Sequence, residues 1–290
     1  MSKLALVSVL LAMVACIDPA GPVIDPSTLD PDTVVLAATS GGGFLMSGQE
    51  EFFVGTRHGR FGLWIYGDRR AILLREDTLQ TLGYRVYRQG TVSEAAFRDL
   101  IDRAAALGLA GERRYTACNA SDGGGEGVAV DLPGVAFTAS SYMGFELYDD
   151  CDGDAGSISS HPDGKPPADV IAFARALFDV DVVDPVVLEP DRIVLAGHVS
   201  EAATPPTYGC DPATSVPWVV AGVTLPVGEP LQLWTAPLEG QPARDARAFV
   251  REHLTDDLNA SYGAACVTQG DLVYRVYYDD VPEGEEAWPF

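Results

Sequence analysis

Positive charge is scarce in this chain. Of 290 residues, 19 are Lys or Arg and 42 are Asp or Glu, which gives a formal charge of −23, and Lys3 and Lys165 are the only lysines. Such an acidic surface repels phosphate backbones, so the composition excludes nucleic-acid binding. An acidic surface could bind a basic partner or an envelope protein partner. The alternative is that the charge only keeps the protein soluble.

Several catalytic and metal-binding signatures are also missing. The chain has no Gly-x-Ser-x-Gly stretch, which excludes a nucleophile elbow. It has no Cys-x-x-Cys, and its four histidines lack the spacing of zinc ligands. His198 follows an apolar strand pattern and is interpreted as a strand-end residue, not a general base. Many carboxylates are present, but the sequence places no particular pair across a cleft.

The N-terminal apolar run, residues 4–15, is too short to span a bilayer, which needs about 20 residues. It follows Lys3 and ends in small residues, the order of a secretory signal. Its end, Met13-Val14-Ala15-Cys16, resembles the lipobox of bacterial lipoproteins. The resemblance implies cleavage before Cys16, a diacylglycerol on its thiol and an acylated amino terminus. The alternative is an ordinary secreted protein that is cleaved elsewhere.

The lipobox resemblance also implies an address. In Gram-negative lipoproteins an aspartate directly after the cysteine favours retention in the inner membrane. Here Ile17 takes that place, and Asp18 follows it. We therefore expect an exported protein of the bacterial cell envelope that is lipid-anchored, with the outer membrane favoured.

The stretch after Cys16 is rich in Pro, Asp, Thr and Gly up to about residue 50. A strand pattern survives there only briefly, at residues 34–38. We therefore predict a lipidated tether over residues 16–50, with a random-coil reach of roughly 30–40 Å. The predicted organisation is a signal peptide (1–15), this tether, one lobe over 51–182 and a second lobe over 183–290.

Four cysteines remain when Cys16 is set aside: Cys118, Cys151, Cys210 and Cys266. An even number in an exported chain predicts disulfides. Sequence alone leaves three pairings open, and proximity favours Cys118–Cys151 with Cys210–Cys266. Each lobe would then hold one disulfide.

Periodicity predicts an α+β fold with mostly antiparallel sheets and a few packed helices. In the first lobe, FGLWIYGD is apolar on both faces, which indicates a central strand. Thr91 and Glu94 fit a capping box for a helix that Gly108 ends, and a second helix follows Pro166-Pro167. GVAVDLPGVAFTAS predicts a hairpin. The second lobe shows four strand patterns, at 191–199, 216–225, 230–236 and 271–280, and one helix at 241–254.

Part of the first lobe resembles a group of uncharacterised bacterial envelope proteins. These have a YGDG-type strand turn followed by a Ser-Glu-Ala helix that ends in Gly-Leu. The matching pieces are Tyr66-Gly67-Asp68-Arg69, Ser93-Glu94-Ala95-Ala96 and residues 104–109. Arg69 stands where that group has glycine. No activity is established for the group, so the resemblance implies architecture only.

One acidic stretch, YDDCDGDAGSIS, resembles an oxygen-ligand calcium loop through Asp150, Asp152 and Asp154. Ala155 takes the position of the required glycine, and His161 that of the final glutamate. The alternative is a solvated acidic loop. No other cofactor is expected.

Three hypotheses follow for function. The first is a membrane-anchored envelope lipoprotein that acts as a non-enzymatic binding or structural module, whose partner is the bilayer through acylated Cys16. The second is a secreted hydrolase without a recognisable motif. The third is a calcium-stabilised module. Whether the chain is an enzyme stays open, with a non-enzyme favoured.

Overall fold

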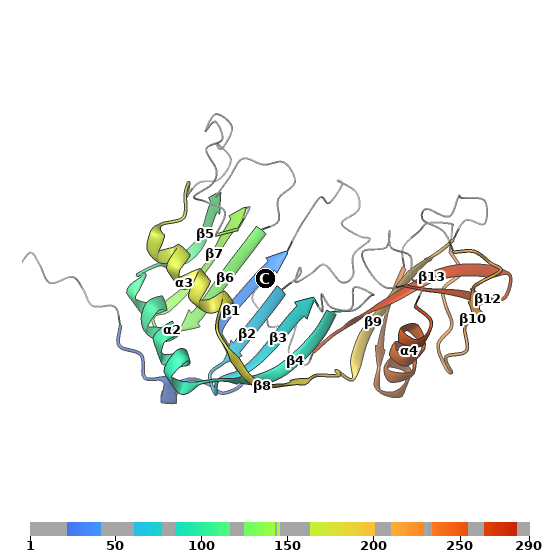
Figure 1. The fold of residues 1–290 in the computed structure, drawn as a ribbon, viewed down its shortest axis with the longest axis horizontal. Helices are drawn as coiled ribbons and strands as arrows, with labels where there is room; N and C mark the ends of the chain where they lie inside the picture. The colour runs from blue at the N-terminus through green and yellow to red at the C-terminus, as the bar shows by residue number, and fades with distance from the viewer. Residues whose placement is uncertain are drawn as a thin grey trace, which may run out of the picture.

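The chain folds around two β-sheets that lie side by side (Figure 1). The structure is a computed structural model. It describes residues 22–41, 61–76, 85–116, 125–142, 144–145, 163–200, 210–228, 232, 234–254 and 264–282. Each sheet has its own hydrophobic core, so we treat a large-sheet region and a small-sheet region in turn.

The large sheet has eight strands in the order β5-β7-β6-β1-β2-β3-β4-β8. The pairing of β5 with β7 is parallel, and the other pairings are antiparallel. In chain order the strands are β1 (Val34–Gly41), β2 (Phe61–Tyr66), β3 (Arg70–Glu76), β4 (Arg85–Val92), β5 (Gly111–Thr116), β6 (Gly125–Leu132), β7 (Val135–Tyr142) and β8 (Val182–Val187).

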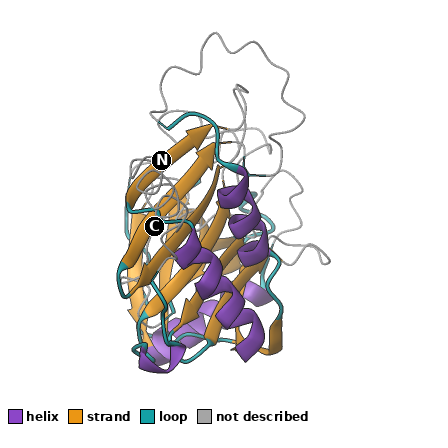
Figure 2. Ribbon diagram, turned by 90° about the vertical axis from the view of Figure 1, so that its left-hand side faces the viewer, coloured by secondary structure: helices purple, strands orange, loops and turns teal. Residues whose placement is uncertain are grey.

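Two helices, α2 (Glu94–Ala106) and α3 (Ala168–Phe178), cover one face of the large sheet (Figure 2). Apolar residues recur along each helix at intervals of three or four, which places them on one face. Phe97, Leu100 and Ile101 of α2 are buried there, as are Phe173 and Leu177 of α3. They meet the inward side chains of the strands in one continuous core.

The opposite face of the large sheet carries a second apolar cluster, centred on Trp64. The Trp64 side chain is fully buried, and its ring centroid lies 6.4 Å from that of Tyr87. The indole lies over Gly62, where an added Cβ would come within 2.2 Å of the ring. Gly62 is thus required for close packing between two residues of the same strand.

The small sheet has five strands in the order β10-β12-β13-β9-β11. Helix α4 (Gly240–Glu252) packs on one face of it, against β9, β11 and β13. Its buried residues include Phe249 and Val250, which join Tyr274 and Val276 of the sheet in a separate core. The strands are β9 (Arg192–Val199), β10 (Val216–Pro217), β11 (Trp234–Glu239), β12 (Ala265–Gln269) and β13 (Leu272–Asp280).

The predicted fold class is confirmed at the level of mostly antiparallel sheets with a few packed helices, although β5–β7 and β10–β12 make both sheets mixed. The predicted tether is wrong for residues 24–41. Ile24 is buried, a 3-10 helix spans Pro26–Thr28, and β1 lies between β2 and β6 in the large sheet. The sequence did not reveal this ordered segment, because its proline and aspartate residues are typical of linkers. In the structure those residues occupy the turns before the strand.

The boundary between the lobes also differs from the predicted one at 182/183. Strand β8 pairs with β4, so it belongs to the large sheet, and the crossing to the small sheet comes at residues 188–191. The cap of α2 is Ser93 and not Thr91, because Thr91 lies in β4 and pairs with Arg70 and Val183. The predicted strand over 216–225 is confirmed only at Val216–Pro217.

Candidate functional site

Most of the residues that the sequence singled out lie outside the described residues. These are the lipidation residue Cys16, the cysteines Cys118 and Cys151, and the calcium candidates Asp150, Asp152 and Asp154. Their roles stay predictions. The structure does place Cys210, Cys266 and His198, and it brings all three to the small sheet.

A disulfide joins Cys210 to Cys266 across 56 residues, with the two Cα atoms 5.4 Å apart. This confirms one of the two predicted pairs. Cys266 lies in β12, and Cys210 begins the described segment that leads to β10, the strand next to β12. The bond therefore fastens a segment with only two residues of strand to the body of the sheet.

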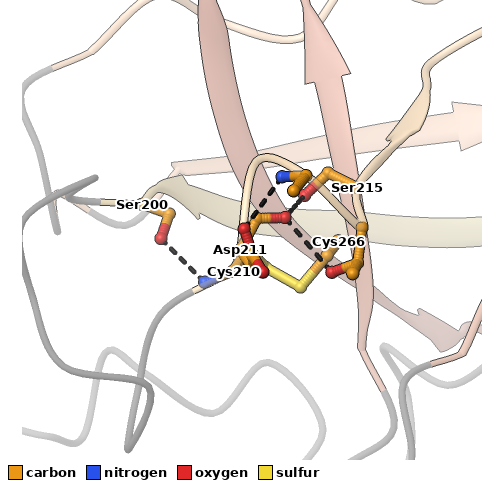
Figure 3. Close-up of a disulfide and its surroundings, with 7 residues drawn as sticks. Ser200, Cys210, Asp211, Ser215 and Cys266 are labelled. Carbon is orange, nitrogen blue, oxygen red and sulfur yellow. Dashed lines mark hydrogen bonds between the residues drawn. A yellow bond between two sulfur atoms is a disulfide. The ribbon is translucent and has the colours of Figure 1, made fainter.

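Polar contacts hold the Cys210 end of the disulfide in place (Figure 3). The backbone N–H of Cys210 donates to the Ser200 hydroxyl over 2.9 Å. Next to it, the Asp211 carboxylate accepts from the backbone N–H of Ala213 over 2.8 Å, and the Asp211 carbonyl accepts from the Ser215 hydroxyl. Such an Asx turn reverses the chain locally and aims it toward β10.

A row of arginines on α4 forms the most extensive charged network of the described residues. Arg244, Arg247 and Arg251 are spaced three and four residues apart, so they share one face of the helix. Arg247 and Asp280 are both 4% exposed, and the Arg247 Nε donates to the Asp280 carboxylate over 2.7 Å. Burial raises the pKa of Asp280, while Arg247 acts in the opposite direction.

The same arginines contact the connector between the two sheets, residues 188–191. Arg247 donates to the Pro190 carbonyl, Arg251 pairs with Glu189 at 3.0 Å, and Arg244 pairs with Asp191. On the other side, the N–H of Leu188 donates to the Tyr87 carbonyl of β4. The connector is therefore attached at both of its ends. These contacts indicate a structural junction.

His198 lies near the end of β9, as its strand pattern predicted, and it is 7% exposed. The strand register sets it opposite Arg275, which in turn lies opposite Cys266. Burial lowers the pKa of His198 to about 4, and the positive charge of Arg275 adds to this. His198 is therefore neutral at neutral pH.

A hollow of about 390 Å³ opens on the face of the large sheet that the helices leave uncovered. The hollow forms because the residues that β1, β6 and β7 direct to this face are small: Ala37, Ala129 and Ala136. Its described lining is mostly apolar. Thr138 and the exposed Asp131 supply the polar side chains. The volume lies within the range of small-molecule sites.

Sequence reasoning missed both the hollow and the Arg247–Asp280 pair. The arginine spacing on α4 and the Asp279-Asp280 end of β13 were visible signals for the pair, but nothing in the sequence shows that these two segments meet. The hollow depends on alanines from three strands that are adjacent only after folding. Small residues at alternate positions carry no such signal on their own.

Comparison of the chain with models of known protein families, with curated proteins and with solved structures finds no match in any of the three. Within the described segments, no helix combines the length and apolar character needed to cross a membrane. Nor do three or more His, Cys, Asp or Glu side chains of those segments gather where they could hold a metal ion. The class of the protein must therefore be argued from its own chemistry.

Proposed function

We propose that this protein is an exported binding module of the bacterial cell envelope, anchored in a bilayer through acylated Cys16. The observation that carries the export is the Cys210–Cys266 disulfide, because such bonds persist in oxidising compartments and are rare in the cytosol. The lipobox-like sequence at Cys16 then supplies the anchor, and two or three acyl chains suffice for stable attachment. The predicted Cys118–Cys151 bond belongs to the same proposal.

The binding surface in this proposal is the hollow on the large sheet. Its mostly apolar lining, with Ala136 exposed, suits an apolar group, and the carboxylate of Asp131 disfavours an anion. The hydrolase hypothesis requires at least two ionisable groups around one pocket. Among its described lining residues the hollow offers a single carboxylate, so a non-catalytic ligand site is the better-supported function.

The anchor is tested by intact-mass analysis of membrane and soluble fractions from cells that express the wild type or Cys16→Ala. We expect the wild type in the membrane fraction, with a mass that fits cleavage before Cys16 and added acyl chains. The variant should be soluble or carry an uncleaved leader. A soluble, unacylated wild type would refute the anchor.

The hollow is tested with a neutral apolar dye whose fluorescence rises on binding, such as N-phenylnaphthylamine. Ala136 lines the hollow and is exposed, so Ala136→Trp should fill it and abolish dye binding without disturbing the fold. The matched control is Ser140→Trp, on the same strand and the same face but outside the hollow. Equal dye binding by both variants would contradict the site.

A further inference from the structure

The first described residues are fixed to the folded body. Ile24 is 8% exposed and joins the core of the large sheet, whereas Val23 just before it is 99% exposed. The Asp25 carboxylate then caps the 3-10 helix by accepting from the N–H of Ser27 over 3.0 Å. The chain that is free to serve as a tether therefore ends at Ile24.

The segment between that helix and β1 is also held. The N–H of Gly67 donates to the Thr33 carbonyl over 3.1 Å, and Arg70 pairs with Asp32 at 3.3 Å. An added Cβ at Gly67 would come within 2.2 Å of the Asp30 carbonyl oxygen. The segment thus packs closely against the β2–β3 turn and cannot extend the tether.

Only eight residues lead from Cys16 to Ile24. Fully extended they span at most about 29 Å, and as a random coil they span about 15 Å. A tether over residues 16–50 would reach twice as far as this coil. We infer that the body lies directly beside the bilayer, with the Ile24 end of the large sheet facing the lipid. This inference rests on the proposed acylation of Cys16.

The strand register defines which end this is. Val34 pairs with Tyr66, so the start of β1 and the β2–β3 turn lie together, and the β6–β7 turn at residues 133–134 lies at the same end. We call this the tether end of the large sheet. The far end carries Gly41 and Gly125, about 25 Å away along strands of eight residues.

The charge at the tether end decides how the body meets the lipid. Its exposed side chains include Asp25, Asp30, Asp32 and Asp68, against which Arg69 and Arg70 supply two positive charges. A net acidic surface is not attracted to anionic headgroups. The acyl chains alone then hold the protein at the membrane, and membrane attachment should be insensitive to salt and to anionic lipid.

The test is energy transfer from a fluorescent amino acid in the lipidated full chain to an acceptor on lipid headgroups. The label replaces Asp131 near the tether end or Ser140 toward the far end, both exposed and on one face of the sheet. We expect higher transfer from position 131. A Gly/Ser insert of about 30 residues between Pro19 and Ala20, which lengthens the coil from about 15 Å to roughly 34 Å, should lower transfer from both positions and remove the difference.

Three results would overturn the inference in distinguishable ways. If the chain floats with vesicles but transfer is equal from both positions, or unchanged by the insert, the orientation is wrong and the anchor stands. If the chain is unacylated and does not float, the proposed function itself fails. Flotation that is lost in high salt would show electrostatic adsorption in place of the short acyl tether.

Discussion

The two sheets bury very different kinds of residue. Five polar or charged residues are buried among those described, and only Ser141 belongs to the large sheet. The other four belong to the small-sheet region: His198, Ser200, Arg247 and Asp280. This region also contains the Cys210–Cys266 disulfide. A small core buries too little apolar surface to stabilise itself fully. The difference therefore indicates that, among the described residues, buried polar contacts contribute more to the small region and apolar packing contributes more to the large region.

The strongest test of this comparison is removal of the disulfide. Closing a 56-residue loop stabilises by about 4 kcal/mol through the entropy of the unfolded chain. We expect Cys210→Ser/Cys266→Ser to lose that amount in denaturant unfolding. Hydrogen exchange should accelerate in β12 and β13 before it does in β1 and β2. Equal acceleration in both sheets would contradict two separately stabilised regions.

The second test breaks the buried ion pair. Arg247→Met leaves the Asp280 carboxylate buried with only Arg251, 3.9 Å away, and should cost about 3 kcal/mol. The matched control, Arg244→Met, removes an exposed pair on the same helix face and should cost less than about 1 kcal/mol.

A double variant, Arg247→Met/Asp280→Leu, removes both charges and should regain most of the loss, since an apolar pair needs no solvation. Chemical denaturation of the wild type, the single variants Arg247→Met and Asp280→Leu, and the double variant measures the cycle. If Arg247→Met costs no more than Arg244→Met, the buried network does not stabilise the small region.

Acid should weaken the small region through His198. Its pKa falls from 6.5 to about 4 on folding, so the folded state prefers the neutral ring. The stability that His198 contributes is complete above pH 6.5 and is lost as the pH falls toward 4. Between pH 7 and pH 5 the loss is about 2 kcal/mol. We expect His198→Gln to show a smaller loss over this interval, and an identical pH profile would rule out the histidine.

The sequence predicted best those elements whose patterns are local. The period of α2, the two-faced apolar run of β2 and the Leu132–Val135 turn all appear where they were expected. Strand β8 was missed because Pro185 and the positive φ of Asp184 interrupt its pattern, and most of its residues are exposed. Strand β1 was undervalued because proline and aspartate surround it.

The candidate sites were less predictable, for a physical reason. Proximity in the sequence favoured the Cys210–Cys266 pair among three pairings, and the structure confirms it. Arg247 and Asp280 are 33 residues apart and meet only because α4 packs across β13. The hollow likewise combines β1 with β6 and β7. Contacts of this kind depend on strand order, which local periodicity does not encode.

The smallest predicted effect lies in the large region. The Ser93 hydroxyl accepts from the N–H of Ala96 over 3.2 Å and caps α2, so Ser93→Ala should cost about 1 kcal/mol. The control is Ser140→Ala, an exposed serine of the same region outside any helix cap, which should change stability by less than about 0.5 kcal/mol. Because this cap stabilises only a helix of the large region, hydrogen exchange should accelerate in the first turn of α2 and stay unchanged in the small sheet. A faster exchange of β12 in Ser93→Ala would show that the two regions unfold together.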